Sequence, residues 1–445
     1  MITKFEKQVV ALLLAATMCL AAVLSCGVAA YAEEIEPAAE AQTRESVTIP
    51  EETSAAPSEG TPVVMSEEAL AVPSGETLVA PSEETPVVTS TGGPVVTSEE
   101  TSIGESEKED NGVEGDVAEN GQKAARAASA SEGNYEYAVL ADDSVAISKY
   151  NGAETDVSVP GTLGGKTVSS IGESAFERND TIEKVTLPAS VTSIQYASFY
   201  GCTNLKNVEL SGNNLKTIEK QAFEGSGLTE FVAPSVETVG EEAFCRCSDL
   251  ENVVFGTQLK SLGEYAFAGS GIRSIQISES VLSRIERGTF WGCGNLSQIK
   301  LPNSVKSIGA YAFYHSGLEA IKIPDSVEEI EECAFSGCQR LTTAELSNSL
   351  RKIGDYAFRS SGLESIELPD SVEEIGREAF SGCQKLAFAM VGNGVTVVGI
   401  SAFENCALTT VTIGNRVEVI DDCAFAGNRK LSKVVIPQNV TRMEY

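Results

Sequence analysis

The unit that decides the fold reads LESIELPDSVEEIGREAFSGC at residues 363–383, and close variants of it follow one another along the chain. Its phenylalanine returns twelve times at intervals of 21 to 24 residues, and an aliphatic residue stands five positions before each one. These phenylalanines are Phe176, Phe199, Phe223, Phe244, Phe267, Phe290, Phe313, Phe335, Phe358, Phe380, Phe403 and Phe425. A period of this length predicts a solenoid, because each coil can bury its apolar side chains only against its neighbours.

Each unit also carries one short strand with a buried and an outward side. In the quoted unit Ile366 is flanked by Ser365 and Glu367, which is the period-two alternation of a strand. Stacked coils therefore predict a β-rich repeat solenoid over residues 131–445, with about twelve repeats and a partial thirteenth. We expect a parallel sheet along one face, short strands and turns on the other, and the phenylalanines stacked as a buried structural ladder.

Two segments of different composition precede the repeats. Residues 1–32 combine a basic start, an almost wholly apolar stretch over 9–24 and a small-x-small sequence ending at Ala32, which predicts a signal peptide cut after that residue. Lipoprotein processing at Cys26 is the alternative cut. Residues 33–130 hold 22 acidic and 4 basic residues, 8 of the 15 prolines and no aromatic residue, so we expect a disordered Pro/Ser/Thr/Glu-rich stalk. The chain is therefore expected to be exported, with an extracellular or cell-surface location and no transmembrane segment in the mature form.

The charge balance and the single histidine narrow the classes of function. With 32 Lys and Arg against 64 Asp and Glu, the formal charge is -32, which disfavours nucleic acid as a partner. One histidine, His315, argues against a histidine-based triad or a multi-histidine metal site. The glycine-rich segment 161–167 is one residue short of a phosphate-binding loop. The carboxylates around Ile330 fit a solvated face better than an acid–base pair. We therefore predict no enzyme, no metal and no cofactor.

Six cysteines share one position, three residues after a repeat phenylalanine. They are Cys202, Cys247, Cys293, Cys338, Cys383 and Cys406. Most fall in every second coil, about 10 Å apart at ~4.8 Å per coil, whereas a disulfide needs Cα atoms within ~7 Å. Cys383 and Cys406 lie in adjacent coils and could form a bridge. We expect the others to be free, small and buried.

The repeat resembles the bacterial BspA-like leucine-rich repeat, through the pattern LxxIxLPxxVxxIGxxAFxxC at residues 363–383. The opening segments 135–137, 145–152 and 165–172 are similar to the first unit of that family, and the resemblance covers about 135–445. It implies a solenoid displayed at the bacterial surface and adhesion to host matrix proteins and other cells. The resemblance carries no functional residue to a position of this chain, because the function of the family lies in the surface of its repeats.

The outward side of the sheet is the candidate binding surface. Phe388 and Met390 place large apolar groups at outward positions, and Thr410 and Thr412 stand beside them in the next coil. An apolar patch with a polar rim is typical of a protein-binding site. The candidate partner-binding residues are Phe388, Met390, Thr410, Thr412, Lys300 and Lys322.

Together these observations favour an exported cell-surface binding protein, an adhesin whose outward face engages a protein or glycoprotein ligand such as host extracellular matrix. The alternative is a structural or cell–cell interaction protein of the bacterial envelope without a host ligand. The chain ends inside a unit, with Met443 where an isoleucine is expected, which points to truncation or to self-association through an uncovered apolar end.

Overall fold

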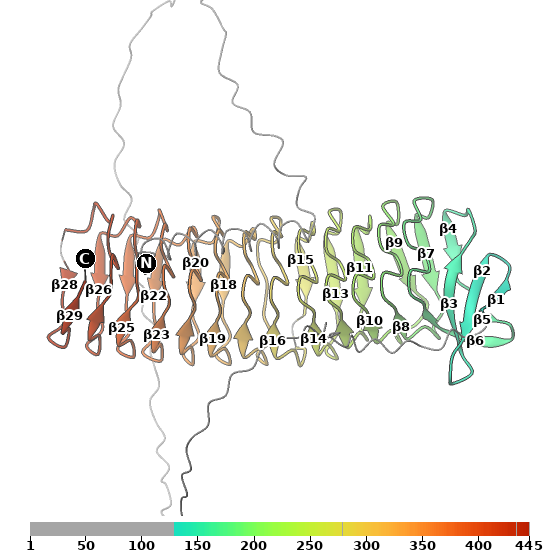
Figure 1. Cartoon of the computed structure of the whole chain (residues 1–445), viewed down its shortest axis with the longest axis horizontal. Helices are drawn as coiled ribbons and strands as arrows, with labels where there is room; N and C mark the ends of the chain where they lie inside the picture. Colours follow the sequence, from blue (N-terminus) through green and yellow to red (C-terminus); the bar gives the residue numbers. More distant parts are fainter. Residues whose placement is uncertain (1–128, 278, 433, 445) are drawn as a thin grey trace, which may run out of the picture. The chain divides into compact units, whose positions relative to one another are not determined.

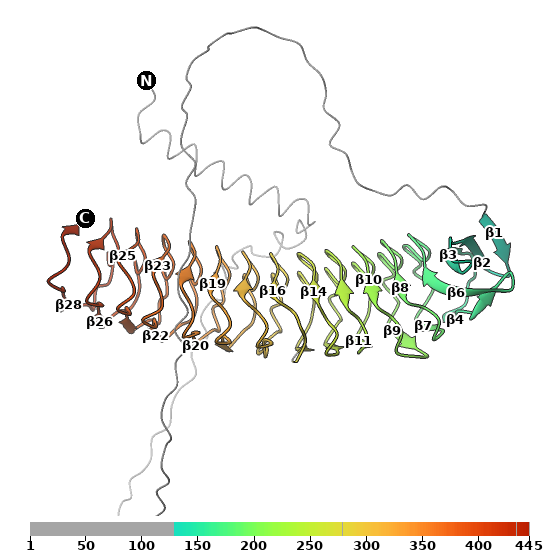
Figure 2. The ribbon, with the colours of Figure 1, turned by 90° about the horizontal axis from the view of Figure 1, so that it is seen from below.

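The computed structural model describes residues 129–277, 279–432 and 434–444, which form a row of stacked coils (Figure 1). The same row is seen from below in Figure 2. All regular elements of the described residues are strands, and none of these residues is in a helix. The predicted leucine-rich repeat solenoid is thus confirmed. The predicted signal peptide, residues 1–32, lies outside the described residues, as does the predicted stalk except for Ser129 and Ala130.

The first ladder of strands follows the predicted L-x-x-I-x-L segments. Its members are β4 (Asp156–Ser158), β7 (Lys184–Leu187), β9 (Asn207–Leu210), β11 (Glu230–Ala233), β13 (Asn252–Phe255), β15 (Ser274–Gln276), β18 (Ala320–Lys322), β20 (Thr343–Glu345), β22 (Ser365–Glu367), β24 (Phe388–Met390), β26 (Thr410–Thr412) and β28 (Val434–Val435). Parallel pairing joins them in four groups: β4-β7-β9, β11-β13-β15, β18-β20 and β22-β24-β26-β28. In β22 Ser365 and Glu367 are exposed while Ile366 is buried, as the alternation predicts. We call the exposed side of this ladder the strand face.

A second ladder of short strands lies in the part of each coil that precedes the phenylalanine. Its members are β8 (Ser193–Ile194), β10 (Thr217–Ile218), β12 (Thr238–Val239), β14 (Ser261–Leu262), β16 (Arg284–Ile285), β17 (Ser307–Ile308), β19 (Glu329–Ile330), β21 (Lys352–Ile353), β23 (Glu374–Ile375), β25 (Val397–Val398), β27 (Val419–Ile420) and β29 (Arg442–Met443). Each brings its buried aliphatic residue into register with those of its neighbours, as Ile330 does with Ile308 and Ile353. These are the short strands expected opposite the main sheet.

A small antiparallel unit covers the N-terminal end of the row. It consists of β1 (Ser129–Glu132), β2 (Tyr135–Val139) and β3 (Val145–Tyr150), with β5 (Thr162–Leu163) paired to β6 (Lys166–Ile171). Tyr150 stacks on Phe176 with 5.1 Å between ring centroids, and Tyr135 packs on Tyr150 at 5.3 Å. Two tyrosines therefore extend the aromatic core beyond the first repeat.

The twelve repeat phenylalanines form one continuous stack. Consecutive ring centroids lie 4.9 to 5.7 Å apart, with angles of 1° to 17° between ring planes. All except Phe425, which is partly buried, are at most 2% exposed. Each stacked pair is worth about 0.5–1.5 kcal/mol beyond the burial of its area. The predicted phenylalanine ladder is confirmed, and it forms one core.

The backbone beside each phenylalanine has a repeated conformation that we did not predict. The residues two positions before and two positions after every repeat phenylalanine have φ between 51° and 73°. Around Phe313 they are Tyr311 at 58° and His315 at 53°. The left-handed region costs a non-glycine residue roughly 1–2 kcal/mol. In return, alternate N–H groups point to the next coil: the Phe313 N–H donates to the carbonyl of Ala334 at 2.8 Å.

The cysteine column satisfies a second set of backbone groups. The thiol of Cys293 donates to the carbonyl of Phe267 at 3.1 Å, and the other five cysteines of the column make the same contact with the phenylalanine one coil earlier. Serines take this position in alternate coils, and the Ser316 hydroxyl lies 3.3 Å from the Cys338 thiol. The column therefore requires a small buried donor, and cysteine and serine both supply one.

The six cysteines of the column are free thiols, with no disulfide between them. Burial raises the pKa of Cys202, Cys247 and Cys293 to about 12. Cys383 and Cys406 are the pair that could form a bridge, and the neighbouring Cys383 thiol, together with burial, raises the pKa of Cys406. The expectation that the column holds free, buried thiols is therefore confirmed for the described residues.

Candidate binding surface

The bulkiest apolar side chains at outward positions of the strand face lie in one strand, β24. Phe388 and Met390 occupy the outward positions of β24, where both are half-buried, and Ala389 between them is fully buried. Parallel pairing sets Phe388 beside Thr410 and Met390 beside Thr412 of β26, and both threonines are exposed. The structure thus brings these four candidate residues together as the apolar patch, which we define as Phe388, Met390, Thr410 and Thr412.

The other flank of the apolar patch is polar. Ser365 of β22 pairs with Phe388, and Glu367 pairs with Met390, so two exposed polar side chains border the apolar ones. The half-buried state of Phe388 and Met390 follows from this register, since each is flanked by strand residues of two neighbouring coils. An apolar centre with a polar border is the arrangement found at protein interfaces.

The two candidate lysines lie elsewhere on the row and are both paired with glutamates. Lys322, in β18, donates to Glu345 at 2.9 Å, and Lys300 lies 3.7 Å from Glu279. The hydrogen bond to Glu345 raises the pKa of Lys322. Lys322 and Lys300 precede Met390 by three and four coils, or ~14 Å and ~19 Å at ~4.8 Å per coil. They are therefore separate from the apolar patch.

Lys300 also lies outside any strand. No strand is assigned among the described residues between β16 and β17, so the first ladder is interrupted between β15 and β18. Its exposed side chain, like that of Lys322, makes an ion pair that water and salt screen, so the pair adds little to stability. A partner with an acidic group could displace either glutamate at little cost.

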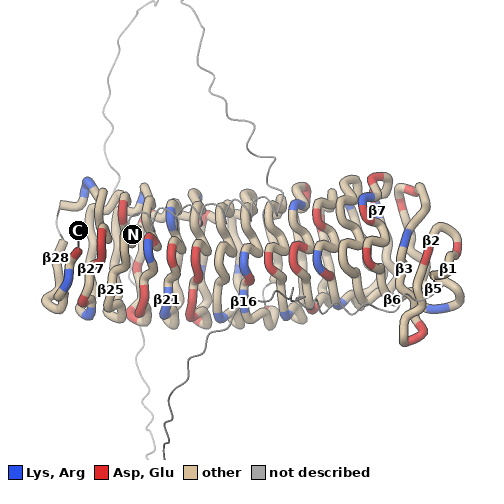
Figure 3. Tube along the Cα trace, in the orientation of Figure 1, with Lys and Arg blue, Asp and Glu red and all other residues tan. Residues whose placement is uncertain are grey.

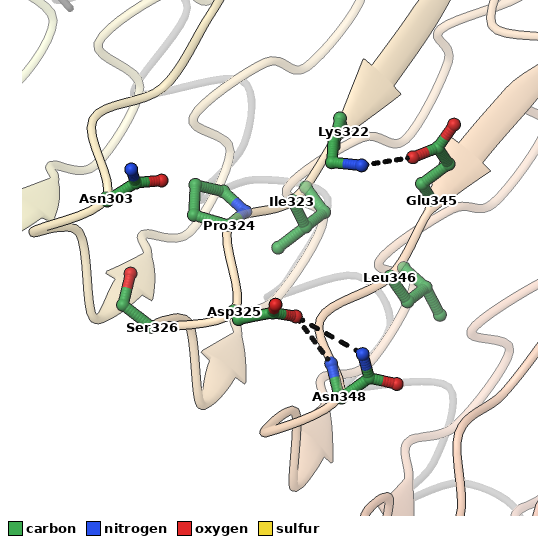
Figure 4. Close-up of a pocket in the computed structure, with 9 residues that line it drawn as sticks. All are labelled: Asn303, Lys322, Ile323, Pro324, Asp325, Ser326, Glu345, Leu346 and Asn348. Carbon is green, nitrogen blue, oxygen red and sulfur yellow. Dashed lines mark hydrogen bonds and ion pairs between the residues drawn. The ribbon is translucent and has the colours of Figure 1, made fainter. Parts of the chain in front are cut away.

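A hollow of about 680 Å³ lies where β18 and β20 end. It is lined by Asn303, Lys322, Ile323, Pro324, Asp325, Ser326, Glu345, Leu346 and Asn348. The apolar side chains of Ile323 and Leu346 lie between two polar pairs, Lys322 with Glu345 and Asp325 with Asn348 (Figure 4). The sequence did not indicate this hollow, because its walls come from turns of successive coils.

The Asp325 carboxylate in the hollow already serves the fold. It accepts hydrogen bonds from the backbone and side-chain nitrogens of Asn348 at 3.2 and 3.4 Å. Asp370 and Asn393 repeat this contact at 2.7 and 3.1 Å in later coils. The acidic group therefore closes a turn, as its counterpart does elsewhere, and the hollow offers Lys322 and the partly exposed Leu346 to a ligand.

Charge is distributed along the whole row. Acidic residues recur in coil after coil, with lysines and arginines between them (Figure 3). Many of the basic groups make ion pairs with a neighbouring coil, as Lys352 does with Glu329 and Glu374 at 3.6 and 3.9 Å. Among the described residues, no group of three or more His, Cys, Asp or Glu has the arrangement of a metal site, and no helix could cross a membrane.

The fold and the exposed strand face define a leucine-rich repeat solenoid that presents an extended surface. The family model of the BspA type leucine rich repeat region matches residues 169–283, 272–387 and 351–445, with six copies. These ranges together cover more than half of the chain, which therefore belongs to this family. Leucine-rich repeat proteins generally bind other proteins, and members of the BspA type are typically bacterial surface proteins.

Solved structures of bacterial leucine-rich repeat proteins resemble the chain. A leucine rich cell surface protein from Faecalibacterium prausnitzii A2-165 is 28% identical, with 71% of this chain and 84% of that chain covered and a TM-score of 0.47. A leucine-rich repeat protein from Bacteroides ovatus ATCC 8483 is 22% identical, with 71% and 90% covered and a TM-score of 0.53. The second likeness shows a shared fold. No curated protein matches the chain.

Proposed function

We propose that the protein is an exported cell-surface adhesin, which engages host or cell-surface proteins through the strand face of its solenoid. In this proposal residues 1–32 are a signal peptide, residues 33–130 are a stalk, and residues 131–445 carry the binding surface. The observation that carries the proposal is the apolar patch, where Phe388 and Met390 replace the small or polar outward residues of the neighbouring strands.

The physical argument rests on exposed apolar area. Outward residues of a strand normally face water, and a large apolar side chain there gains about 25 cal/mol per Å² when a partner covers it. Thr410 and Thr412 add hydroxyl groups that can donate to and accept from the same partner. Such a site binds by complementarity, so we assign no catalytic residue and no cofactor to it.

Binding to host matrix proteins and mucins, measured with soluble residues 131–445, tests the proposal. We expect saturable binding to at least one of these ligands. The double variant Phe388→Ser with Met390→Ser should weaken it at least tenfold. Val232→Ser is the matched control, because Val232 is an exposed apolar residue on the strand face, seven coils from the apolar patch. Equal binding by the double variant and the parent would exclude the apolar patch as the site.

Binding to other bacterial cells without any binding to host ligands would instead indicate the envelope interaction protein that the sequence left open. In that case the adhesin proposal fails. The same double variant, measured in a cell-aggregation assay, then tests whether the strand face binds other bacterial cells. Loss of aggregation in that variant would keep the apolar patch as a binding surface with a bacterial partner.

A further inference from the structure

A cluster of aromatic rings lies on the turns beside the phenylalanine ladder, away from the strand face residues discussed above. We define the aromatic cluster as Tyr265, Trp291, Tyr311 and Tyr314, all half-buried. Trp291 is its centre: its ring centroid lies 5.9 Å from Tyr265, 5.5 Å from Tyr311 and 5.0 Å from Tyr314. This is the single tryptophan of a chain with only 6% aromatic residues.

Three successive coils contribute to the aromatic cluster, and a glycine makes room for it. Tyr265, Gly288 and Tyr311 occupy the same position, two residues before the phenylalanine, in consecutive coils. A Cβ at Gly288 would overlap the Tyr265 ring, so only glycine lets this ring lie over the next coil. Its φ of 60° is the left-handed conformation shared by Tyr265 at 54° and Tyr311 at 58°. The aromatic cluster is thus a built arrangement.

One cation is already held by these rings. The guanidinium of Arg287 lies over the ring of Tyr311, 4.7 Å from its centroid, and its Nε donates to the Tyr265 hydroxyl at 3.0 Å. Aromatic faces attract cations through their quadrupole, by roughly 0.5–1 kcal/mol at exposed sites and more when water is excluded. Arg287 shows that the geometry of the aromatic cluster suits a guanidinium.

The border of the aromatic cluster is acidic. The exposed Glu332 accepts a hydrogen bond from the Tyr311 hydroxyl at 3.2 Å. Arg284, in the same coil as Trp291, is engaged by Glu286 at 3.0 Å and Glu331 at 2.6 Å. The border therefore attracts positive charge, and tryptophan, tyrosine and arginine are the residues that most often dominate protein interfaces.

We propose that the aromatic cluster is a second interaction surface, which binds a protein partner through a lysine or arginine side chain that the partner presents next to apolar groups. The cation lies against the aromatic rings beside the Glu332 carboxylate, and the apolar groups cover Trp291. This surface is distinct from the apolar patch, because it has a separate set of residues, lies on the turns and selects a basic segment.

The chain carries its own reporter for the test, since Trp291 is its one tryptophan. The full chain is titrated with an octapeptide of alternating arginine and leucine, and with its counterpart containing glutamate in place of arginine. We expect a saturable change in Trp291 emission with the basic peptide and none with the acidic peptide. No saturable change with the basic peptide would overturn the proposal.

Variants separate the aromatic cluster from the general negative charge of the chain. Measured by the anisotropy of the fluorescein-labelled basic peptide, Trp291→Ala and Tyr311→Ala should each weaken binding at least about tenfold. Tyr356→Ala is the matched control: Tyr356 has the same position in its coil, a left-handed φ of 59° and its own arginine at 5.4 Å. It should leave binding unchanged.

Two other results would overturn the proposal. If Trp291→Ala, Tyr311→Ala and Tyr356→Ala all weaken binding equally, or if none of them weakens it, the peptide binds through the dispersed negative charge of the chain. A saturable Trp291 response to cellohexaose, without one to the basic peptide, would identify a glycan site instead. Circular dichroism shows whether Trp291→Ala is folded. Trp291→Phe keeps an aromatic ring and should retain most of the affinity for the basic peptide. If Trp291→Ala misfolds, the affinities of Trp291→Phe and Tyr311→Ala decide the test.

Discussion

Along the same coils, the interior keeps the same kind of residue at each position, whereas the strand face does not. Inside, the phenylalanine ladder holds its spacing within 4.9 to 5.7 Å from the first repeat to the last. Outside, β22 presents Ser365 and Glu367, whereas β24, the next strand, presents Phe388 and Met390. A position that repeats in every coil is explained by stacking alone. A position that departs from the repeat is not explained by stacking. Binding should therefore be sought at positions such as Phe388 and Met390.

The largest expected effect of a single substitution lies in the phenylalanine ladder. Phe313→Ala removes a fully buried ring from the middle of the stack, and should lower the free energy of unfolding by about 3–5 kcal/mol. Thr343→Ala, at an exposed outward position of β20, should change it by less than about 0.5 kcal/mol. Urea denaturation followed by circular dichroism measures both. Equal effects would remove the distinction between interior and strand face.

The cysteine column sharpens the comparison through its pH dependence. Burial raises the pKa of Cys247 to about 12 from an ordinary value of 9.0. Above pH 9 the unfolded chain releases this proton and the folded chain keeps it, so stability falls by about 1.4 kcal/mol per pH unit for this thiol, up to about pH 12. Below pH 9 both states hold the proton, and the thiol adds no pH dependence.

The variant Cys247→Ser tests whether the buried thiol makes stability fall as the pH rises above 9. Serine fills the same position in alternate coils, so the variant should match the parent at pH 7 within about 1 kcal/mol, and the hydroxyl should keep the hydrogen bond to the Phe223 carbonyl. Its stability should then decline less steeply than that of the parent between pH 9 and 11, by about 1.4 kcal/mol per pH unit. Parallel declines measured by urea denaturation would contradict a buried, protonated thiol.

A third prediction concerns the left-handed positions. Gly288→Ala should cost about 1–2 kcal/mol, because alanine is strained at a φ of 60° and its Cβ overlaps the Tyr265 ring. Ser174→Gly, in the same position of the first repeat with a φ of 53°, should leave stability within about 0.5 kcal/mol of the parent. Thermal melts compare the two. A Gly288→Ala protein as stable as the parent would mean that Tyr265 lies elsewhere.

The smallest expected effect on stability belongs to the apolar patch. The double variant Phe388→Ser with Met390→Ser should change the free energy of unfolding by about 1 kcal/mol or less, since both side chains are only half-buried and face outward. Urea denaturation gives this value alongside the binding assay. A loss as large as that of Phe313→Ala would assign these side chains to the core and would remove the argument for a binding role.

Much of the interior could be predicted from the sequence, because a buried position must hold the same kind of residue in every coil. The phenylalanine ladder, the aliphatic residue before it and the alternation in strands such as β22 all follow from that requirement. The left-handed positions could not be predicted, since Gln221, Glu242 and Tyr265 occupy them without any turn signature. At these positions the backbone hydrogen bonds to the next coil outweigh the preference of non-glycine residues for negative φ.

The surfaces were predicted only in part. The register of β24 and β26 follows from the repeat, so Phe388 and Thr410 were placed together correctly as neighbours. The aromatic cluster was missed, because Tyr265 and Trp291 hold different positions in their units and meet only across coils. The sequence signal was the 23-residue spacing of Tyr265, Gly288 and Tyr311, with a glycine where its neighbours carry rings.

Hydrogen–deuterium exchange of the full chain, with and without the strongest ligand from the matrix and mucin binding screen, tests the central claim most directly. The account predicts that segments containing the phenylalanine ladder exchange slowly and equally in both states. Peptides that contain residues 388–390 and 410–412 should gain protection when the ligand is bound. Protection gained around Phe313 and its neighbours in the ladder, with none at 388–390, would contradict a structural interior and a binding strand face.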